Sequence, residues 1–397
     1  MIKRMIPYIL SLLILAGAII AVSEQADKSQ PSKATADTAA VKEEMRGLWV
    51  TYMTLNTEGE ENTEKAFHAK IDAIVNDMVE DSFNTMVVQV RPFCDAVYRS
   101  SYFPWSHILT GSQGKDPGFD PLAYICKRCK SANISVHAWV NPYRVCTAET
   151  PSELSEDNPA VRDPSLTAEI NGARYLKPSS EKARELIVDG VIELLTNYDI
   201  DGIQFDDYFY PENCGDFDSE DYEAYCANSP SPLTLEEYRK ENVNMLISSV
   251  YQAVHITKPD AVFGISPQGN LNNNKTLYAD VQRWCSEAGY IDYICPQIYF
   301  SLDNPALTYE DALAQWTALQ KHKGLDLYIG LAGYKAGTDA DRGTWLDNSD
   351  ILKNEIQIAQ VSGCGGFMLY SYDSLHNIEN EAEIKNVIRY LKSSPTQ

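Results

Sequence analysis

The chain has 397 residues, of which 44% are hydrophobic, and its 56 acidic and 33 basic side chains give a formal net charge of −23 at pH 7. The apolar content is that of an ordinary globular protein, and the length suits one large domain or two to three small ones. So negative a chain repels phosphates and anionic lipid headgroups, which argues against nucleic acid and anionic membrane surfaces as partners.

The first residues predict export. Lys3 and Arg4 precede an apolar run from Ile6 to Val22, so residues 1–22 are expected to be a signal peptide or a membrane anchor. Residues 23–44 are rich in Ser, Thr, Ala and Lys, which predicts a disordered linker. We therefore expect an extracellular or cell-surface protein that meets the membrane only through its N-terminal segment, with one folded domain over residues 45–393.

From Arg46 onward, short apolar segments alternate eight times with segments whose apolar residues have helical spacing, as in Phe67, Ile71, Ile74, Val75 and Met78. Eight such repeats predict an α/β fold of the (β/α)₈ barrel type. The alternative, a doubly wound open sheet, would require a Gly-rich fingerprint after an early strand, and none is present. Strands are expected at 46–52, 83–91, 134–143, 201–207, 262–270, 291–300, 325–334 and 365–372. Helices are expected at 63–81, 121–131, 180–198, 235–254, 277–288, 309–322, 351–361 and 381–391.

Loop lengths indicate which end of this barrel carries a site. The joins from helix to strand are short, whereas the joins from strand to helix are long, notably 92–120, 144–179 and 209–234. Barrels keep their sites on the loops that follow the C-terminal ends of the strands. The alternative is that these insertions only surround the barrel mouth and carry no site.

Two adjacent carboxylates, Asp206 and Asp207, end the fourth strand and are followed by aromatic residues. A charge in a parallel strand is costly to desolvate, so it normally lies where the strand opens into a cavity. The competing interpretation is a structural pair that accepts backbone hydrogen bonds from the next loop. A functional role is the stronger hypothesis for this pair.

Residues at the same strand parity as Asp206 converge on the same end of the barrel. Each alone is weak evidence: His137 commonly satisfies a core hydrogen bond, and Arg91 could simply neutralise an aspartate. Together they form a cleft of amide, aromatic and charged groups, which is the chemistry of sugar recognition. The predicted substrate-binding residues are Arg91, His137, Trp139, Asn141, Gln268, Asn270, Gln297, Tyr299 and Tyr372.

Other chemistries lack their motifs. There is no G-x-S-x-G, H-E-x-x-H or phosphate-loop pattern, and no His/Asp/Glu triplet has metal spacing, so we expect neither a metal nor another cofactor. Glycoside cleavage needs two carboxyl groups, one of which is an acid of raised pKa. Asp206 is the first candidate, although in a regular strand Asp207 would point to the other face. Asp373, after the eighth strand, or Asp95, after the second, could supply the partner.

Several motifs resemble the glycosyl hydrolase-like 10 family over about residues 44–392: R-G-L-W-V-T from Arg46, V-V-Q-V-R-P ending at Pro92, H-A-W-V-N-P-Y-R from His137, D-G-I-Q-F-D-D-Y-F-Y-P, I-S-P-Q-G-N and C-P-Q-I-Y. The resemblance implies a bacterial envelope protein with a TIM barrel. It also implies a glycosidase acting on cell-wall or related polysaccharide, with peptidoglycan glycan strands as the best-known substrate class. The family's D-D pair falls on Asp206 and Asp207.

The sequence therefore predicts a metal-independent glycosidase that hydrolyses an extracellular polysaccharide. One alternative is a non-catalytic glycan-binding barrel that tethers the cell to its wall, which would keep the aromatic and amide groups without depending on a carboxylate. A weaker alternative is a polysaccharide deacetylase, which would require a set of metal ligands.

Overall fold

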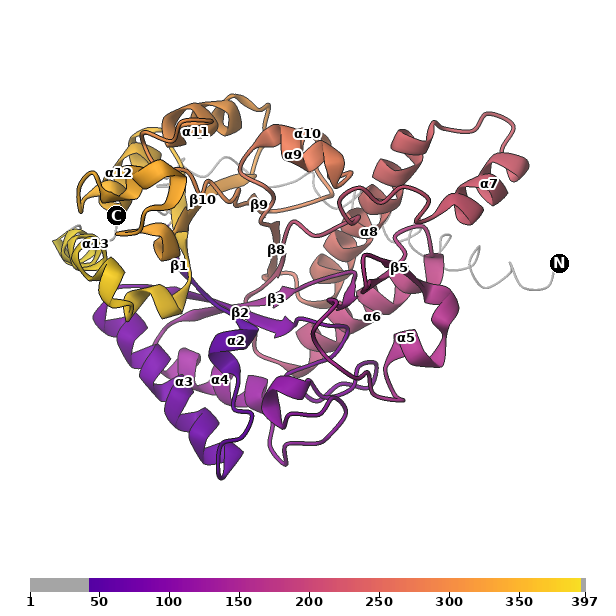
Figure 1. Ribbon diagram of the computed structural model, residues 1–397, viewed down its shortest axis with the longest axis horizontal. Helices are drawn as coiled ribbons and strands as arrows, with labels where there is room; N and C mark the ends of the chain where they lie inside the picture. Colours follow the sequence, from indigo (N-terminus) through magenta and orange to yellow (C-terminus); the bar gives the residue numbers. More distant parts are fainter. Residues whose placement is uncertain (1–42, 394–397) are drawn as a thin grey trace, which may run out of the picture. The chain divides into compact units, whose positions relative to one another are not determined.

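The computed structural model describes residues 43–393, so the predicted signal or anchor segment and nearly all of the predicted linker lie outside the described residues. Eight parallel strands close into a barrel in which each strand pairs with the next along the chain, and the last pairs with the first. Helices surround the strands (Figure 1). The predicted (β/α)₈ fold is confirmed. The barrel strands are β1 (Met45–Val50), β2 (Thr85–Arg91), β3 (Ser135–Val140), β7 (Gly202–Phe205), β8 (Val262–Ile265), β9 (Tyr293–Ile294), β10 (Asp326–Ala332) and β11 (Gly366–Tyr370).

Several of the larger helices begin where an N-cap side chain accepts from a free backbone N–H group. Asp120 accepts a hydrogen bond from Ala123 N, and Thr234 forms a capping box with Glu237. Such caps fix where the chain turns from the barrel into the outer layer. The helices of this layer are α3 (Thr63–Glu80), α4 (Pro121–Ser131), α6 (Glu181–Asn197), α8 (Leu235–Thr257), α10 (Val281–Ser286), α11 (Tyr309–Ala318), α12 (Ile351–Val361) and α13 (Glu381–Ser393).

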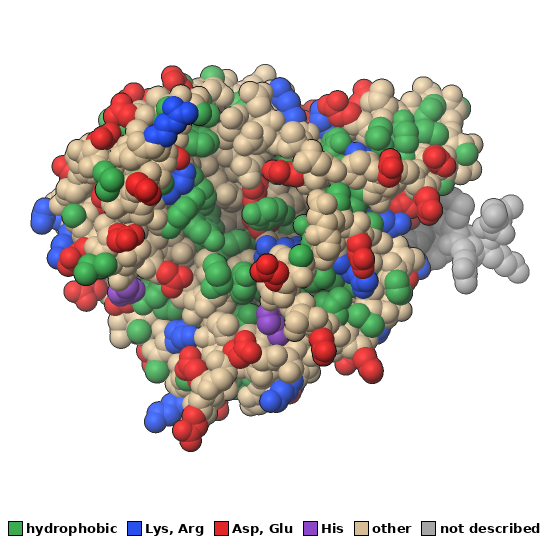
Figure 2. All heavy atoms as spheres, in the orientation of Figure 1, with side chains coloured by type: hydrophobic (Ala, Val, Ile, Leu, Met, Phe, Trp, Pro, Cys, Tyr) green, Lys and Arg blue, Asp and Glu red, His purple; other side chains and the backbone are tan. Residues whose placement is uncertain are grey.

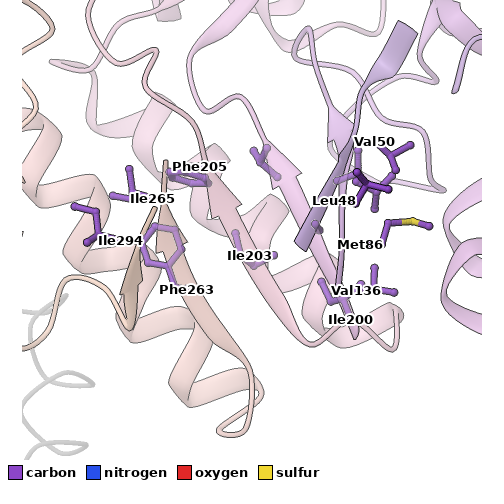
Figure 3. Packing of buried hydrophobic residues seen from close by; sticks show 14 of the residues in the cluster. Leu48, Val50, Met86, Val136, Ile200, Ile203, Phe205, Phe263, Ile265 and Ile294 are labelled. Atoms are coloured by element: carbon purple, nitrogen blue, oxygen red, sulfur yellow. The ribbon is translucent and has the colours of Figure 1, made fainter. Parts of the chain in front are cut away.

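Alternation along each strand divides the core into two parts. Outward side chains such as Leu48, Ile203 and Phe263 are fully buried against the helices (Figure 3). Inward side chains form a separate aromatic cluster inside the barrel, which includes Trp49 and Tyr293. The strands are therefore buried on both faces, as parallel sheets require.

Two predicted elements differ from the structure. The helix expected at 277–288 is present as the shorter α10, which begins only at Val281. Tyr278 adopts a left-handed conformation with φ of 55°, which separates α10 from a further short helix, α9 (Leu271–Thr276). The strand expected at 291–300 shrinks to β9, because Pro296 has no N–H to continue the ladder. Pairing resumes beyond it at Gln297, which bridges to Gly330 on β10 and to Gln268 in the segment that follows β8.

The long join after β3 is more ordered than its sequence suggested. It folds into a three-stranded antiparallel sheet, hereafter the inserted sheet, with the strand order β4-β6-β5. Its strands are β4 (Arg144–Cys146), β5 (Thr167–Ile170) and β6 (Ala173–Leu176). The other short elements are α2 (Tyr52–Leu55), η2 (His107–Leu109), α5 (Pro159–Arg162), η3 (Pro164–Leu166), α7 (Ser219–Asn228), η4 (Gly333–Lys335), η5 (Ala340–Leu346), η6 (Tyr372–Leu375) and η7 (Ile378–Asn380). No helix within residues 43–393 combines the length and apolarity needed to cross a bilayer.

Candidate active site

A cavity of about 320 Å³, hereafter the mouth cavity, opens at the C-terminal ends of the barrel strands. On the face drawn in Figure 2, hydrophobic side chains gather around a central hollow, while charged side chains are more frequent toward the edge. Aromatic, amide and carboxylate groups line the cavity. They are Trp49, Trp139, Gln204, Asp206, Asp207, Tyr208, Ser266, Gln268, Gln297, Tyr299, Tyr334 and Tyr370.

Both carboxylates of the Asp206–Asp207 pair reach the mouth cavity, because β7 ends at Phe205 and strand alternation no longer applies to them. Each residue is only 3% exposed. Trp139 Nε1 donates to Asp206 Oδ2 over 3.3 Å, and Asn141 Nδ2 donates to the same oxygen. The pair is therefore held on the cavity wall by defined donors.

The two amides predicted from β8 and β9 hold the second carboxylate. Gln297 Nε2 donates to Asp207 Oδ1 over 3.2 Å, and Gln268 Nε2 donates to Asp207 Oδ2. In the same wall, the buried hydroxyl of Ser266 has no hydrogen-bond partner among the described residues and is available to a ligand.

Burial, followed by the charge of Asp207, raises the pKa of Asp206 to about 7. Burial also raises the pKa of Asp207, and the hydrogen bonds from Gln268 and Gln297 oppose that rise because they favour the ionised carboxylate. The pair therefore combines a carboxyl that keeps its proton near neutral pH with a neighbour whose charge two amides support. Two adjacent carboxyls held in different hydrogen-bonding surroundings are a common arrangement for acid and base roles within one site.

The barrel interior below the cavity is a hydrogen-bonded aromatic floor. Trp49 Nε1 donates to Gln204 Oε1 over 2.7 Å, and Gln204 Nε2 donates to the Tyr293 hydroxyl over 3.2 Å. His137 Nδ1 lies 3.0 Å from the same hydroxyl, and burial lowers the pKa of His137 to about 4. His137, predicted to line the cleft, does not line the mouth cavity and is a neutral side chain within the floor beneath it.

Arg91 was predicted to line the cleft but lies outside it. A register shift in β2 pairs Gln89 with the inward Trp139 and Arg91 with the outward Val140, so the bulge reverses the parity of Arg91. Its guanidinium donates to the carbonyl oxygens of Asn141 and Pro142 and stacks over a phenylalanine ring. It fixes the backbone that carries Asn141.

Two other predicted site residues, Asp373 and Tyr372, lie at element ends outside the mouth cavity. Asp373 is exposed on η6, where its Oδ2 accepts from the Thr54 hydroxyl over 2.7 Å. Tyr372 donates to Asp77 on α3, because β11 ends at Tyr370, which takes the place in the cavity predicted for Tyr372. These side chains belong to the outer layer.

Asn270 also lies outside the cavity, because it caps α9 by accepting from Asn272 N. Asn141 is buried and does not line the cavity, but it contacts Asp206 directly and so positions that carboxylate. Asp95, the alternative second carboxyl, is buried within the loop after β2, where it accepts from Phe93 N. Among residues 43–393, the only acids that line the mouth cavity are thus Asp206 and Asp207.

Sequence reasoning missed Trp49, Tyr208 and Tyr370 as cavity residues, and it missed Arg144 beside them. Strand alternation could have identified Trp49, because it lies two residues after Gly47, which faces Met368 inside the barrel. Arg144 is the last residue of the H-A-W-V-N-P-Y-R motif, but it lies on β4, beyond the end of β3, where strand alternation made no prediction. Its guanidinium lies 5.8 Å from the centre of the Tyr208 ring. Its charge also opposes the rise in the pKa of Asp206.

The donor set limits what the site can hold. Within the described part of the chain, no three His, Cys, Asp or Glu side chains are placed to bind a metal ion together. None of the residues that line the mouth cavity is a lysine or arginine, so the wall provides no cation for an anionic ligand. Aromatic faces, amides and two carboxylates suit a ligand with hydroxyl groups and flat apolar faces.

Comparison with known proteins gives consistent matches. The model of the glycosyl hydrolase-like 10 family matches residues 44–347. Glycosyl hydrolase YngK of Bacillus subtilis is 37% identical over 76% of this chain and 62% of its own length, so the chain spans less than two thirds of that relative. Glycosyl hydrolase DigH of Escherichia coli is 30% identical over 91% of this chain and 90% of its own length.

Solved structures with low identity share the fold. The alpha-L-fucosidase isoenzyme 2 from Paenibacillus thiaminolyticus has a TM-score of 0.56 at 11% identity, covering 88% of this chain and 49% of that one. The PgaB (BpsB) glycoside hydrolase domain from Bordetella bronchiseptica has a TM-score of 0.54 at 11% identity, covering 86% and 98%. At such identity these likenesses bear on the fold alone.

Proposed function

Because the chain belongs to the glycosyl hydrolase-like 10 family, we propose that it is a glycosidase that hydrolyses a cell-wall or other extracellular polysaccharide, with peptidoglycan glycan strands as the favoured substrate. The observation that carries this proposal is the pair of adjacent buried carboxylates, one with a pKa near 7, in an aromatic and amide cavity at the barrel mouth. A tethering module would gain nothing from burying two acids, because each costs desolvation energy.

The chemistry divides between the two carboxylates. Asp206, protonated near neutral pH, gives its proton to the glycosidic oxygen as the bond to the anomeric carbon breaks. Asp207, ionised and fixed by Gln268 and Gln297, supplies negative charge to the oxocarbenium-like transition state. Water completes the reaction at the anomeric carbon and restores the proton to Asp206.

The direct test uses the purified full-length chain and purified peptidoglycan glycan strands. We expect new reducing ends to accumulate with time, and mass spectrometry to show products with masses consistent with hydrolysis. Binding to the strands without new reducing ends would contradict the proposal and favour the tether. Comparison with other extracellular polysaccharides then ranks the substrates.

The pH dependence of kcat/KM should be bell-shaped. Activity should fall as the pH rises through about 7, because Asp206 then loses the proton that it must donate. It should also fall on the acid side, as Asp207 becomes protonated at a pH above the ordinary aspartate value. Gln268→Ala should move the acid limb to higher pH, because one hydrogen bond to the Asp207 carboxylate is lost. An unchanged acid limb would contradict the role given to Asp207.

We further propose that the protein acts at the cell surface, since the predicted export segment precedes the barrel. Secretion of the full-length chain, compared with a chain lacking residues 1–22, tests this placement.

A further inference from the structure

A second cavity of about 230 Å³, hereafter the side cavity, adjoins the mouth cavity. Tyr208 and Gln268 line both, so the two cavities share a wall. Gln268 donates to Asp207 within the mouth cavity while it also borders the side cavity. The second cavity therefore begins next to the carboxylates.

One face of the inserted sheet forms the far side of the side cavity. Ala173 and Tyr175 lie two residues apart on β6 and so point to the same face, and Ile170 pairs directly with Ala173 across the sheet. All three line the side cavity. The insertion after β3 thus presents a regular surface toward the barrel mouth.

Tyr208 marks the boundary between the cavities and is unusually exposed for so large a ring, at 51%. The guanidinium of Arg144 lies over the Tyr208 ring. The backbone N–H of Tyr208 donates to Asp206 Oδ1 over 3.5 Å. An exposed aromatic ring beside a general acid offers a stacking surface for a sugar next to the bond that is cleaved.

The side cavity carries the same kinds of groups as the mouth cavity. Asn171 offers an amide, Glu212 a carboxylate and Tyr175 a half-buried phenol, alongside apolar Ile170 and Leu277. Amide and hydroxyl groups pair with sugar hydroxyls, and the aromatic rings cover the apolar faces of sugars. A ligand limited to the mouth cavity would leave this matching surface unused.

We propose that the side cavity is a second sugar-binding subsite, and that the enzyme cleaves within a polymer whose successive sugars occupy both cavities past Tyr208. This inference rests on the proposed glycosidase function and extends it from a sugar class to a chain-length requirement. The inserted sheet is then a specificity element that selects long glycans.

The test measures kcat/KM for size-fractionated oligosaccharides of peptidoglycan glycan strands. In the parent chain, kcat/KM should rise with length until both cavities are filled. Tyr175→Ala removes a wall of the side cavity and Ala173→Trp fills it, so each should reduce the ratio of kcat/KM between long and short substrates by about tenfold, equivalent to about 1.4 kcal/mol of binding.

Matched controls separate the subsite from general damage. Tyr251→Ala removes a half-buried tyrosine of α8 that lines neither cavity, and Glu169→Trp places the bulky ring on the opposite face of the inserted sheet. Both should keep the length dependence of the parent. Thermal unfolding of each variant verifies that the fold is intact.

Binding of the same oligosaccharides to Asp206→Asn, with and without Tyr175→Ala, gives a readout that needs no turnover. The expected result is a loss of affinity in the double variant that is confined to the long oligosaccharides. Equal length dependence in the parent and the side-cavity variants overturns the subsite and leaves the glycosidase proposal standing. Length-dependent binding without any hydrolysis overturns the glycosidase proposal and leaves the subsite standing.

Discussion

Replacing Asp206 by Asn should lower kcat for glycan hydrolysis by roughly 10³-fold, within the range that general acid catalysis contributes. Asn keeps the size of the side chain but has no acidic proton to give to the leaving oxygen. Because Asp206 is buried and its pKa is raised, the folded protein binds that proton more tightly than the unfolded chain. The associated stability is lost as the pH rises from about 4 to about 7, so Asp206→Asn should unfold at an equal or higher temperature at pH 8.

Two comparisons make the result specific. Asp373→Asn changes an exposed carboxylate that contacts Thr54 outside the cavity, so it should leave kcat unchanged. A substrate with a strongly acidic leaving group needs no proton, so it should restore most of the activity of Asp206→Asn but not that of Asp207→Asn. Full activity of Asp206→Asn on unactivated glycan would refute the assignment of the acid.

Arg239→Met should lower the free energy of unfolding by about 3–5 kcal/mol, because it leaves the buried carboxylate of Asp218 without its partner. The Arg239 side chain is 4% exposed and that of Asp218 is fully buried, with a nitrogen–oxygen distance of 2.6 Å. Arg239 on α8 also donates to Gly215 O, and Tyr210 donates to Asp218. The pair therefore anchors the loop that follows Asp206 and Asp207.

Urea unfolding, monitored by circular dichroism, measures this effect. Lys240→Met is the matched control: it removes the next cation on α8, whose partner Glu236 is exposed, and should cost less than about 1 kcal/mol. Combining Arg239→Met with Asp218→Leu should recover much of the loss, since apolar groups then replace both charges. A loss in Arg239→Met no larger than that in Lys240→Met would contradict this role of the ion pair.

Much of the architecture is a local property of the sequence. Helical spacing, caps such as Thr234 and buried strands set the eight repeats, and the order of strands and helices leaves few folds to choose from. The adjacent Asp206 and Asp207 could be identified from the sequence because a charge at the end of a buried strand is costly to desolvate, which favours a functional role. Trp139, Gln268, Gln297 and Tyr299 followed from strand parity, and all line the cavity.

Tertiary structure determined which side chains reach the mouth cavity at the positions where strand alternation could not. Strand alternation predicts the wrong side-chain direction where a strand has a bulge, as before Arg91. It also makes no valid prediction beyond the end of a strand, as after Phe205 and Tyr370. The bulge places Arg91 outside the mouth cavity. The strand ends explain why Asp207 lines the cavity and why Asp373 does not. Contacts that join distant segments, such as Arg144 over Tyr208 and the inserted sheet beside the mouth, exist only once the barrel has closed, because no local pattern encodes which loops meet there.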